Sequence, residues 1–305
     1  MSQKTRITLV ICTRNNAAKL ELTLQYLLKL LPSEVQVLVV DQSSKPRKKS
    51  DRIKVIHLPN QKGLSKARNS AITAVDSEMI AWIDDDCIIT HEYVQELERI
   101  SKLAATAKQK KLAGVCGRTL PFEKTRPSRD AYCPCTFSKL DNSPVKEVKT
   151  HWKHVGYGNN MIIFKHVFES LGGFKEWLGV GSIGESGEDS EFMIRCLNAG
   201  LEFQYDHELL IFHNKWLDVQ QKSSQYMKYI CGGLIVYGYY TFRGVTACKE
   251  DFKQELNSCL QQFVSLYWEF RQHPTHFLEY IKSVFLNIYF FSKGIFLAYF
   301  FAHTS

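Results

Sequence analysis

Three adjacent carboxylates, Asp84, Asp85 and Asp86, are the residues of this chain best suited to chemistry. They follow residues 80–83, an apolar run whose β-branched and aromatic side chains predict a buried strand. Like charges at one strand end repel each other, and in a low-dielectric neighbourhood they are destabilising unless a cation lies among them. Hard oxygen ligands suit Mg²⁺ or Mn²⁺, which share their coordination with waters and substrate phosphates. The alternative is an acidic loop without a metal.

A second acidic group lies at residues 184–193, Gly-Glu-Ser-Gly-Glu-Asp-Ser-Glu-Phe-Met. Glycines before it and apolar residues after it predict a loop that enters an amphipathic helix. Asp189 shares a helix face with Phe192, so its carboxylate should border the core rather than bulk water. The alternative is structural, because acidic side chains favour the first turn of any helix. Glu191 and Arg195 are four residues apart, which predicts a surface ion pair.

Buried strands and helices alternate through the first part of the chain and would position these groups. Near-continuously apolar strands in this order predict a parallel sheet covered by helices on both faces. Ligands bind at the carboxyl ends of such strands. Polar residues follow the strand ends, so we expect Thr13, Arg14, Asn15 and Asp41 to share one crevice with the three aspartates. The predicted strands are residues 7–12, 35–40, 53–58 and 79–83, and the helix before the last strand is residues 64–75.

The composition is that of a globular protein with a large core. The chain has 305 residues, 45% of them hydrophobic, and a net charge of +8, which predict one or two domains. The positive charge suits nucleic acid, an anionic membrane or a phosphorylated substrate, but no nucleic-acid motif accompanies it. No apolar signal segment precedes the first strand. The nine scattered cysteines favour thiols in a reducing cytosol, and a zinc site at Cys133 and Cys135 is the minority interpretation.

The ordered series of motifs resembles the family 2 glycosyltransferases, which have the α/β GT-A fold, a Rossmann-like nucleotide-binding sheet with helices on both faces. The resemblance covers about residues 5–215, and the series is far more specific than any single motif. Its first part is Ile-Thr-Leu-Val-Ile-Cys-Thr-Arg-Asn from residue 7, Val-Val-Asp41, Gly63-Leu-Ser-Lys-Ala-Arg68-Asn and Ile-Asp84-Asp-Asp86. Its second part is Gly158-Asn-Asn160, Leu171-Gly-Gly-Phe174, Gly187-Glu188-Asp189 and a late His213.

The resemblance implies a nucleoside diphosphate sugar as the donor, often a uridine one. Asp41 would accept the N3–H of the base, since a carboxylate can only accept. Arg68 would lie near the diphosphate, and the alternative is an ordinary exposed helix cation. Asp84 would bind the ribose, while Asp86 and His213 would hold Mn²⁺ or Mg²⁺. The implied donor-binding residues are Thr13, Arg14, Asn15, Asp41, Gly63, Arg68, Asp84 and Asp85.

The resemblance also implies that Asp189 is the general base, which deprotonates the acceptor hydroxyl so that attack inverts the anomeric carbon. A helix N-terminus lowers the pKa of a carboxylate, whereas partial burial and Glu188 raise it, and the sequence leaves the balance open. Trp177 and Glu188 are the candidate acceptor-binding residues. For Trp177 the alternative is a hydrophobic anchor of a glycine-rich loop.

Residues 118–157 have weak periodicity and resemble the variable acceptor-facing insertion of this fold. Several aromatic and imidazole side chains there could stack on a sugar ring or pack under the loop. They are His151, Trp152, His154 and Tyr157.

The character of the chain changes after residue 215. Helices are predicted at residues 224–243, 251–271 and 281–301. The last is long enough to span a bilayer, but Lys282, Asn287 and Lys293 interrupt it, and a lysine near the middle of a span is costly. We therefore expect an in-plane helix on an anionic cytoplasmic leaflet, or a helix packed on the catalytic domain. A buried helical subdomain or a homo-oligomer interface is the alternative.

These patterns together predict an inverting, metal-assisted glycosyltransferase that acts on a glycan or lipid-linked acceptor. Residues 1–218 are expected to form the GT-A catalytic domain, and residues 219–305 the helical region. A sugar nucleotidyltransferase would need a glycine-rich phosphate loop after the first strand, which Thr13-Arg14-Asn15 does not provide. The other alternative is a catalytically silent nucleotide-sugar-binding scaffold. The protein is expected in the cytoplasm, with no nucleic-acid partner.

Overall fold

The structure is a computed structural model that describes residues 7–45, 50–103, 111–142, 144–147, 155–272 and 277–304. The chain divides into two compact units. The sheet unit comprises Met1–Glu176 and Asp189–Val219, and the helical unit comprises Trp177–Glu188 and Gln220–Ser305. The sequence placed a single boundary after residue 218, whereas the loop before Asp189 also groups with the C-terminal helices. The sugar-stacking candidates His151, Trp152 and His154 lie outside the described residues.

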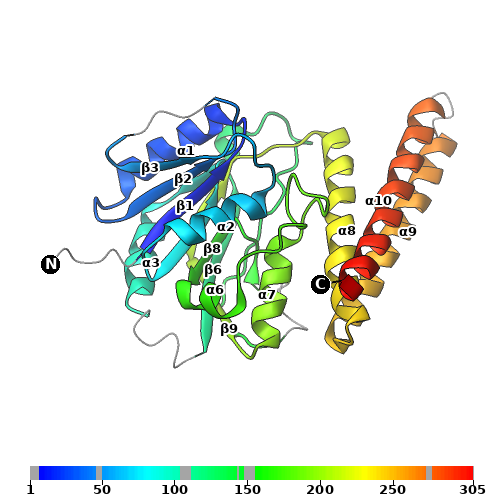
Figure 1. Cartoon of the computed structure of the whole chain (residues 1–305). Helices are drawn as coiled ribbons and strands as arrows, with labels where there is room; N and C mark the ends of the chain where they lie inside the picture. Colours follow the sequence, from blue (N-terminus) through cyan, green and yellow to red (C-terminus); the bar gives the residue numbers. More distant parts are fainter. Residues whose placement is uncertain are drawn as a thin grey trace. The chain divides into compact units, whose positions relative to one another are not determined.

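A nine-stranded sheet in the order β3-β2-β1-β4-β8-β6-β9-β5, with β7 beside β9, forms the core of the sheet unit among the described residues (Figure 1). β1, β2, β3 and β4 pair in parallel, as the sequence predicts. The strands are β1 Ile7–Thr13, β2 Gln36–Asp41, β3 Ile53–His57, β4 Met79–Asp84, β5 Cys87–Ile89, β6 Leu112–Pro121, β7 Pro144–Val145, β8 Asn160–Phe164 and β9 Glu202–His213.

Helices cover both faces of this sheet. The chain moves one way along the sheet from β1 to β2 and the other way from β3 to β4, so right-handed crossovers put α1 and α2 on opposite faces (Figure 1). Both faces of β1 and β4 are therefore buried, which explains their continuous apolar sequence. The helical elements of the sheet unit are α1 Ala17–Leu30, α2 Leu64–Ala74, α3 His91–Ser101, η1 Glu123–Thr125, α6 Lys165–Leu171 and α7 Glu188–Asn198.

The second half of the sheet is mixed, whereas the parallel strands that the sequence predicted all belong to the first part of the chain. β8 runs antiparallel to both β4 and β6, and β6 runs parallel to β9. Only Asp85 and Asp86 separate β4 from β5, yet β5 leaves the neighbourhood of β4 and pairs antiparallel with β9. This crossing brings the end of β9 to the turn of Asp84, Asp85 and Asp86, hereafter the acidic turn.

Glu191 and Arg195 form a buried ion pair, so the predicted surface pair is wrong. The Glu191 side chain has no exposed surface, and both its oxygens accept from the Arg195 guanidinium, at 3.0 and 2.8 Å. The same guanidinium donates to the carbonyls of Leu171 and Gly173, at 2.6 and 2.7 Å. The pair thus ties α7 to the turn after α6. Helical spacing alone could not distinguish this arrangement from a solvated pair, because that turn is distant in sequence.

The helical unit consists of α8 Val219–Phe242, η3 Thr246–Cys248, α9 Lys249–Gln272 and α10 Phe277–Thr304, and α9 packs beside α10 (Figure 1). Each helix predicted in this region is present and longer than predicted. Tyr280–Thr304 of α10 is long and apolar enough to cross a membrane by length and composition alone, which is weak evidence. Only 28% of its most apolar stretch is buried within the protein.

We expect Arg195→Met to destabilise the protein by roughly 3 kcal/mol, because the substitution removes the guanidinium that neutralises a fully buried carboxylate. Chemical denaturation would measure the change in the free energy of unfolding. Lys253→Met is the matched control, since Lys253 and Glu250 form an exposed ion pair on α9. Equal stability losses in the two variants would contradict the structural role of Arg195.

Candidate active site

The carboxyl ends of β1, β2 and β4 lie side by side and gather most of the predicted donor-binding residues. Thr13 pairs with Asp41, and the residue before Thr13 pairs with Asp84. Asp41 is buried, and one carboxylate oxygen accepts from the Ser43 backbone N–H at 2.8 Å. The predicted convergence of strand ends is therefore present in the fold.

Residues on the two loops beside β2 are held in place by backbone contacts. Asn15 has a positive φ of 55°, and its N–H donates to the Ser43 hydroxyl at 2.8 Å. Gly63 also has a positive φ, of 114°, and its carbonyl accepts from the Gln42 amide at 3.1 Å. Arg14 is exposed beside them. Both loops thus present ordered backbone next to Asp41.

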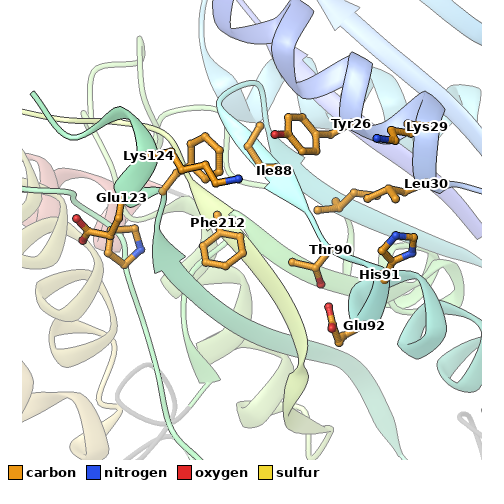
Figure 2. Close-up of a pocket in the computed structure, with 13 residues that line it drawn as sticks. Tyr26, Lys29, Leu30, Ile88, Thr90, His91, Glu92, Glu123, Lys124 and Phe212 are labelled. Carbon is orange, nitrogen blue, oxygen red and sulfur yellow. The ribbon is translucent and has the colours of Figure 1, made fainter.

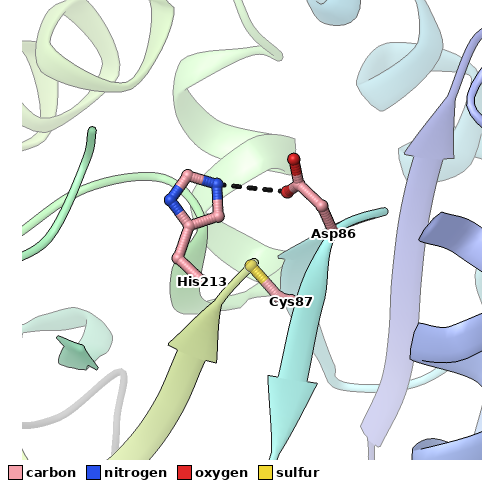
Figure 3. Close-up of side chains that lie close together, drawn as sticks. All are labelled: Asp86, Cys87 and His213. Atoms are coloured by element: carbon pink, nitrogen blue, oxygen red, sulfur yellow. Dashed lines mark hydrogen bonds and ion pairs between the residues drawn. The ribbon is translucent and has the colours of Figure 1, made fainter. Parts of the chain in front are cut away.

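Asp86 and His213 meet because β5 pairs with β9. That pairing sets Cys87 opposite His213, and the residue before Cys87 then lies against the imidazole. The His213 Nε2 lies 3.1 Å from an Asp86 oxygen (Figure 3). The other ring nitrogen, Nδ1, lies 2.7 Å from the Pro134 carbonyl, which orients the ring. The two side chains predicted to bind a metal are therefore adjacent.

The charged groups around this pair shift one another's pKa values. Burial opposes the charge on His213, but hydrogen bonds to Asp86 and Cys133 and the carboxylates of Asp86 and Asp84 outweigh it and raise the pKa of His213 to about 10. Burial alone would raise the pKa of Asp86, yet the bond to His213 and the charges of His213 and Lys215 lower it. Burial also raises the pKa of Asp84 more than Arg68 lowers it. The acidic turn therefore favours additional positive charge.

Asp86 and His213 fit a divalent cation. A carboxylate oxygen and an imidazole nitrogen on adjoining strand ends suit Mn²⁺, and Mg²⁺ can use the carboxylate. The Cys87 sulfur also lies within 4.8 Å of their ligand atoms. Burial raises the pKa of the Cys87 thiol well above its usual range. A cysteine sulfur is also a soft ligand, which suits Mn²⁺ and Mg²⁺ less well than oxygen does. The remaining coordination positions would fall to substrate phosphates and water.

The described residues contain one other acidic group of this kind, formed by Glu96, Asp206 and Glu208. The guanidinium of Arg99 already pairs with Glu96 and Asp206, so this group has its own cation. Neither cysteine of the alternative zinc site belongs to such a group in the described residues, and the Cys133 thiol donates to the His213 carbonyl at 3.4 Å.

Asp85 is hydrogen-bonded to residues of β1, of α1 and of the turn between them. Its carboxylate accepts from the Thr13 hydroxyl and from the Asn16 amide, at 2.5 and 2.8 Å. The Thr23 hydroxyl donates to its backbone carbonyl at 3.0 Å. Burial, and secondarily the charge of Asp86, raises the pKa of Asp85 to about 7. Asp85 and Thr13 thus brace the acidic turn, and Asn16 is a contributor that the sequence analysis missed.

Arg68 is buried, so the alternative of an exposed helix cation is wrong. Its side chain is 3% exposed, with the guanidinium 5.2 Å from the ring centre of Phe174. Its Nη2 lies 3.8 Å from an Asp84 oxygen and donates to the Gly158 carbonyl at 3.1 Å. One guanidinium therefore joins the end of β4 to the loop before β8.

Asp189 lies on the other side of Gly158. The Gly158 N–H donates to one Asp189 oxygen and the Ser190 N–H to the other, both at 2.8 Å. A Cβ at Gly158 would lie 3.0 Å from the Asp189 Cβ and 3.2 Å from Arg68 Nη1, which is tighter than ordinary packing allows. A side chain at this position would require Asp189 or Arg68 to shift by a few tenths of an ångström. The Gly-Asn-Asn motif marked the position without revealing this contact.

The predicted acceptor-binding residues belong to the helical unit. Trp177 stacks on Phe301, with ring centres 4.1 Å apart, and contacts Tyr239, as its anchoring alternative predicted. Glu188 is buried and immediately precedes Asp189. In the sheet unit, Tyr157 packs edge-on against Phe137. Trp177 and Glu188 thus belong to one unit and Tyr157 to the other.

A separate apolar pocket of about 570 Å³ lies where α1, β5 and the end of β6 meet (Figure 2). Ile88 and Phe212, which line it, neighbour the metal-pair residues in sequence, but no predicted site residue lines it. Lysine and glutamate side chains lie among its lining residues, including Lys124 and Glu123. Its chemistry suits an apolar group better than a nucleoside diphosphate.

Comparison with known proteins places these features in a family. The sequence profile of glycosyl transferase family 2 matches residues 8–172, which is more than half of the chain. The pre-mycofactocin glycosyltransferase of Mycobacterium tuberculosis is 25% identical over 224 residues, covering 68% of this chain and 42% of that protein. The glycosyltransferase EpsH of Bacillus subtilis is 27% identical over 173 residues, covering 54% of this chain and 48% of that protein. The chain thus spans less than half the length of these relatives.

A solved structure has a similar fold along nearly the whole chain. It is the mannosyltransferase PcManGT of Pyrobaculum calidifontis, in complex with GDP-Man and Mn²⁺. The TM-score is 0.57 at 12% sequence identity, and the match covers 97% of this chain and 88% of that one. The likeness confirms the predicted GT-A architecture.

We expect Asp86→Ala to abolish the rise in melting temperature that Mn²⁺ causes in the unchanged protein, because it removes a carboxylate ligand. The measurement is thermal unfolding with and without Mn²⁺, compared within each variant, since loss of the His213 partner also alters stability directly. Asp130→Ala, which removes an exposed carboxylate, is the control. An undiminished Mn²⁺ shift in Asp86→Ala would rule out the ligand role.

Proposed function

Because the chain belongs to glycosyl transferase family 2, we propose that it transfers a sugar from a nucleoside diphosphate sugar to a hydroxyl of a glycan or lipid-linked acceptor. One observation carries this proposal. Through a single buried guanidinium, Arg68 contacts Asp84 on the donor side and the Gly158 carbonyl, while the Gly158 N–H holds Asp189. A donor site and a general base are thereby joined within one connected group.

The donor is proposed to be a UDP-sugar. Asp41 is a buried acceptor at the tip of β2, and it suits the imide N–H of uracil. Thr13, Arg14, Asn15 and Gly63 would surround the base and ribose, and Asp84 would accept from a ribose hydroxyl. PcManGT binds GDP-Man, and guanine also carries a ring N–H that a carboxylate can accept, so a GDP-sugar is the competing donor.

Asp86 and His213 are proposed to hold Mn²⁺ or Mg²⁺. When bound, the cation would neutralise charge on the diphosphate leaving group. His213 must lose its proton to serve as a ligand. Lys215 lies close enough for its charge to lower the pKa of both Asp84 and Asp86. It is a further candidate for the diphosphate that sequence reasoning missed, since no motif marked it.

Asp189 is proposed to act as the general base. Two backbone N–H groups orient its carboxylate, and it would take the proton of the acceptor hydroxyl. The acceptor oxygen then bonds to the anomeric carbon as the bond from that carbon to the diphosphate oxygen breaks, with the electron pair leaving on the diphosphate. Attack from the side opposite the leaving group inverts the anomeric centre. Trp177 and Glu188, just before Asp189 in the chain, would help to bind the acceptor.

Donor identity can be tested by thermal shift of the full chain with UDP- and GDP-sugars in the presence of Mn²⁺. A UDP-sugar should raise the melting temperature most, because a ligand stabilises only the state that binds it. A larger shift with GDP-sugars would replace the uridine assignment. The absence of any shift across the panel would count against nucleotide-sugar binding, and hence against both the enzyme and the scaffold hypotheses.

We expect Asp189→Asn to lower transfer by roughly 10²- to 10⁴-fold, because the amide cannot accept the hydroxyl proton. Donor affinity should be nearly unchanged. Release of nucleoside diphosphate would be followed with a panel of p-nitrophenyl glycosides as acceptors, and donor affinity by thermal titration. Glu169→Asn, at an exposed position on α6, is the control. Retained turnover in Asp189→Asn would refute the base assignment, and a donor-binding chain that never turns over would favour the scaffold alternative.

We also propose that α10 attaches the protein to an anionic membrane, on the cytoplasmic face. Exposed apolar side chains of α10 form a stripe spaced seven and four residues apart: Leu278, Phe285, Tyr289, Phe296 and Phe300. Leu286, Ile288 and Tyr299, which are also exposed, flank this stripe. Residues 280–304 contain no Asp or Glu, and they include Lys282, which is exposed. An aromatic stripe with positive charge suits the headgroup region of an anionic bilayer.

Flotation with vesicles tests this attachment. The full chain should float with vesicles that contain phosphatidylglycerol. The double variant Phe285→Ser with Phe296→Ser should lose this binding, because it removes two aromatic side chains that would be buried in the bilayer interface. Val219→Ser, at an exposed apolar position outside α10, is the control. Light scattering after gel filtration tests the alternative of an oligomer interface. If the protein is a dimer that the double variant dissociates, and it does not bind vesicles, the stripe is an interface between copies of the chain.

A further inference from the structure

Lys293, in the apolar α10, is paired with a residue far away in sequence. Its ammonium lies 2.7 Å from a carboxylate oxygen of Glu185, and the two side chains are only 12% and 23% exposed. The ammonium also lies 5.3 Å from the ring centre of Tyr289. The sequence marked Lys293 as a cost to membrane insertion, and this contact gives the residue a partner within the helical unit.

Glu185 belongs to the segment Trp177–Glu188, hereafter the 177–188 loop. Glu185 has a positive φ of 66°, a backbone conformation that is uncommon for a residue with a side chain. The loop is also closed on itself, because the Gly184 N–H donates to the Trp177 carbonyl and the Ser186 N–H to the Gly184 carbonyl, both at 2.8 Å. The strained backbone at Glu185 is therefore held within a compact loop.

Two further contacts fix this loop to the same helices. The Ser186 hydroxyl donates to the Lys228 carbonyl of α8 at 3.0 Å. A Cβ on Gly232 would lie 2.1 Å from the Ser186 Oγ, so the helix must carry a glycine where the loop crosses it. At the start of the loop, Trp177 stacks on Phe301 of α10 at an interplanar angle of 13°. The loop is therefore anchored along its length to α8 and α10.

The loop is joined directly to the proposed general base, since Glu188 is followed by Asp189. The conformation of the 177–188 loop sets the backbone of Glu188, the first residue of α7. The Glu185–Lys293 pair lies three residues before Glu188, at the strained position of the loop. Anchoring at this point limits the conformations open to the residues that precede the base.

We propose that Lys293 and Glu185 are positioning residues for the acceptor step: their ion pair holds the 177–188 loop in the conformation that presents Glu188, the residue before the proposed base, to the acceptor. This inference rests on the proposed function. Neither residue is proposed to touch the donor.

The physical part of the proposal can be tested by hydrogen–deuterium exchange of the full chain. Lys293→Met and Glu185→Gln should each speed exchange in peptides that cover residues 179–187, because the loop loses the same contact in both. Lys249→Met is the matched control, since it removes an exposed lysine of the same unit outside α10 and changes net charge as Lys293→Met does. Lys293→Arg should retain slow exchange. Unchanged exchange in both Lys293→Met and Glu185→Gln would overturn the proposal.

The functional part is tested with the same variants, using the best donor and p-nitrophenyl glycoside found for the unchanged protein. Lys293→Met and Glu185→Gln should lower kcat/KM for the acceptor by about 10- to 100-fold, because misplacement near a reacting group is costly. Donor affinity should stay within about twofold by thermal titration. Lys293→Arg and the charge exchange Glu185→Lys with Lys293→Glu should recover part of the loss, which a merely destabilised chain would not do.

The outcomes separate this proposal from the one on which it rests. If the unchanged protein transfers no sugar from any donor, the proposed function fails, while the exchange experiment still reports whether the ion pair holds the loop. If transfer is present and both variants keep full kcat/KM, the positioning role is wrong and the function stands. A loss shared equally by Lys249→Met would assign the effect to net charge and also overturn the proposal.

Discussion

The pairing register between β5 and β9 is the constraint on which the candidate site depends. It sets Cys87 opposite His213 and so forces Asp86, the preceding residue, against the imidazole. A shift by one residue would turn the alternate side chains to the other face and separate the two groups. β5 has only three residues, Cys87–Ile89, so the turn that precedes it must also be held from outside.

That outside support explains how the sheet tolerates three adjacent carboxylates. Each one has a different partner: Arg68 lies beside Asp84, hydroxyl and amide donors hold Asp85, and His213 binds Asp86. Such distribution lowers the cost of gathering like charges at one edge. It also divides their roles, because Asp85 braces the turn while its neighbours remain at the strand ends.

Connections between distant segments recur through the molecule. Arg68 links β4 to the Gly158 loop, Arg195 links α7 to the turn after α6, and Lys293 links α10 to the 177–188 loop. In each case a long cationic side chain carries its charge to a partner in a distant segment. The first two of these connections lie in the sheet unit and reach the segment around Asp189, whose surroundings there draw on residues far apart in the chain.

The sequence alone determined the parallel strands β1 to β4, the placing of polar residues at their ends and the motif series of the family, since local periodicity and strand-end chemistry are written in consecutive residues. It also identified Asp86 and His213 as partners, though only through the ordered motifs. The tertiary structure decided the antiparallel insertion of β8, the buried state of Arg68 and Glu191, the bracing role of Asp85 and the partner of Lys293. Each of these depends on a contact between residues far apart along the chain, and helical or strand spacing carries no information about which distant group will arrive to share a buried charge.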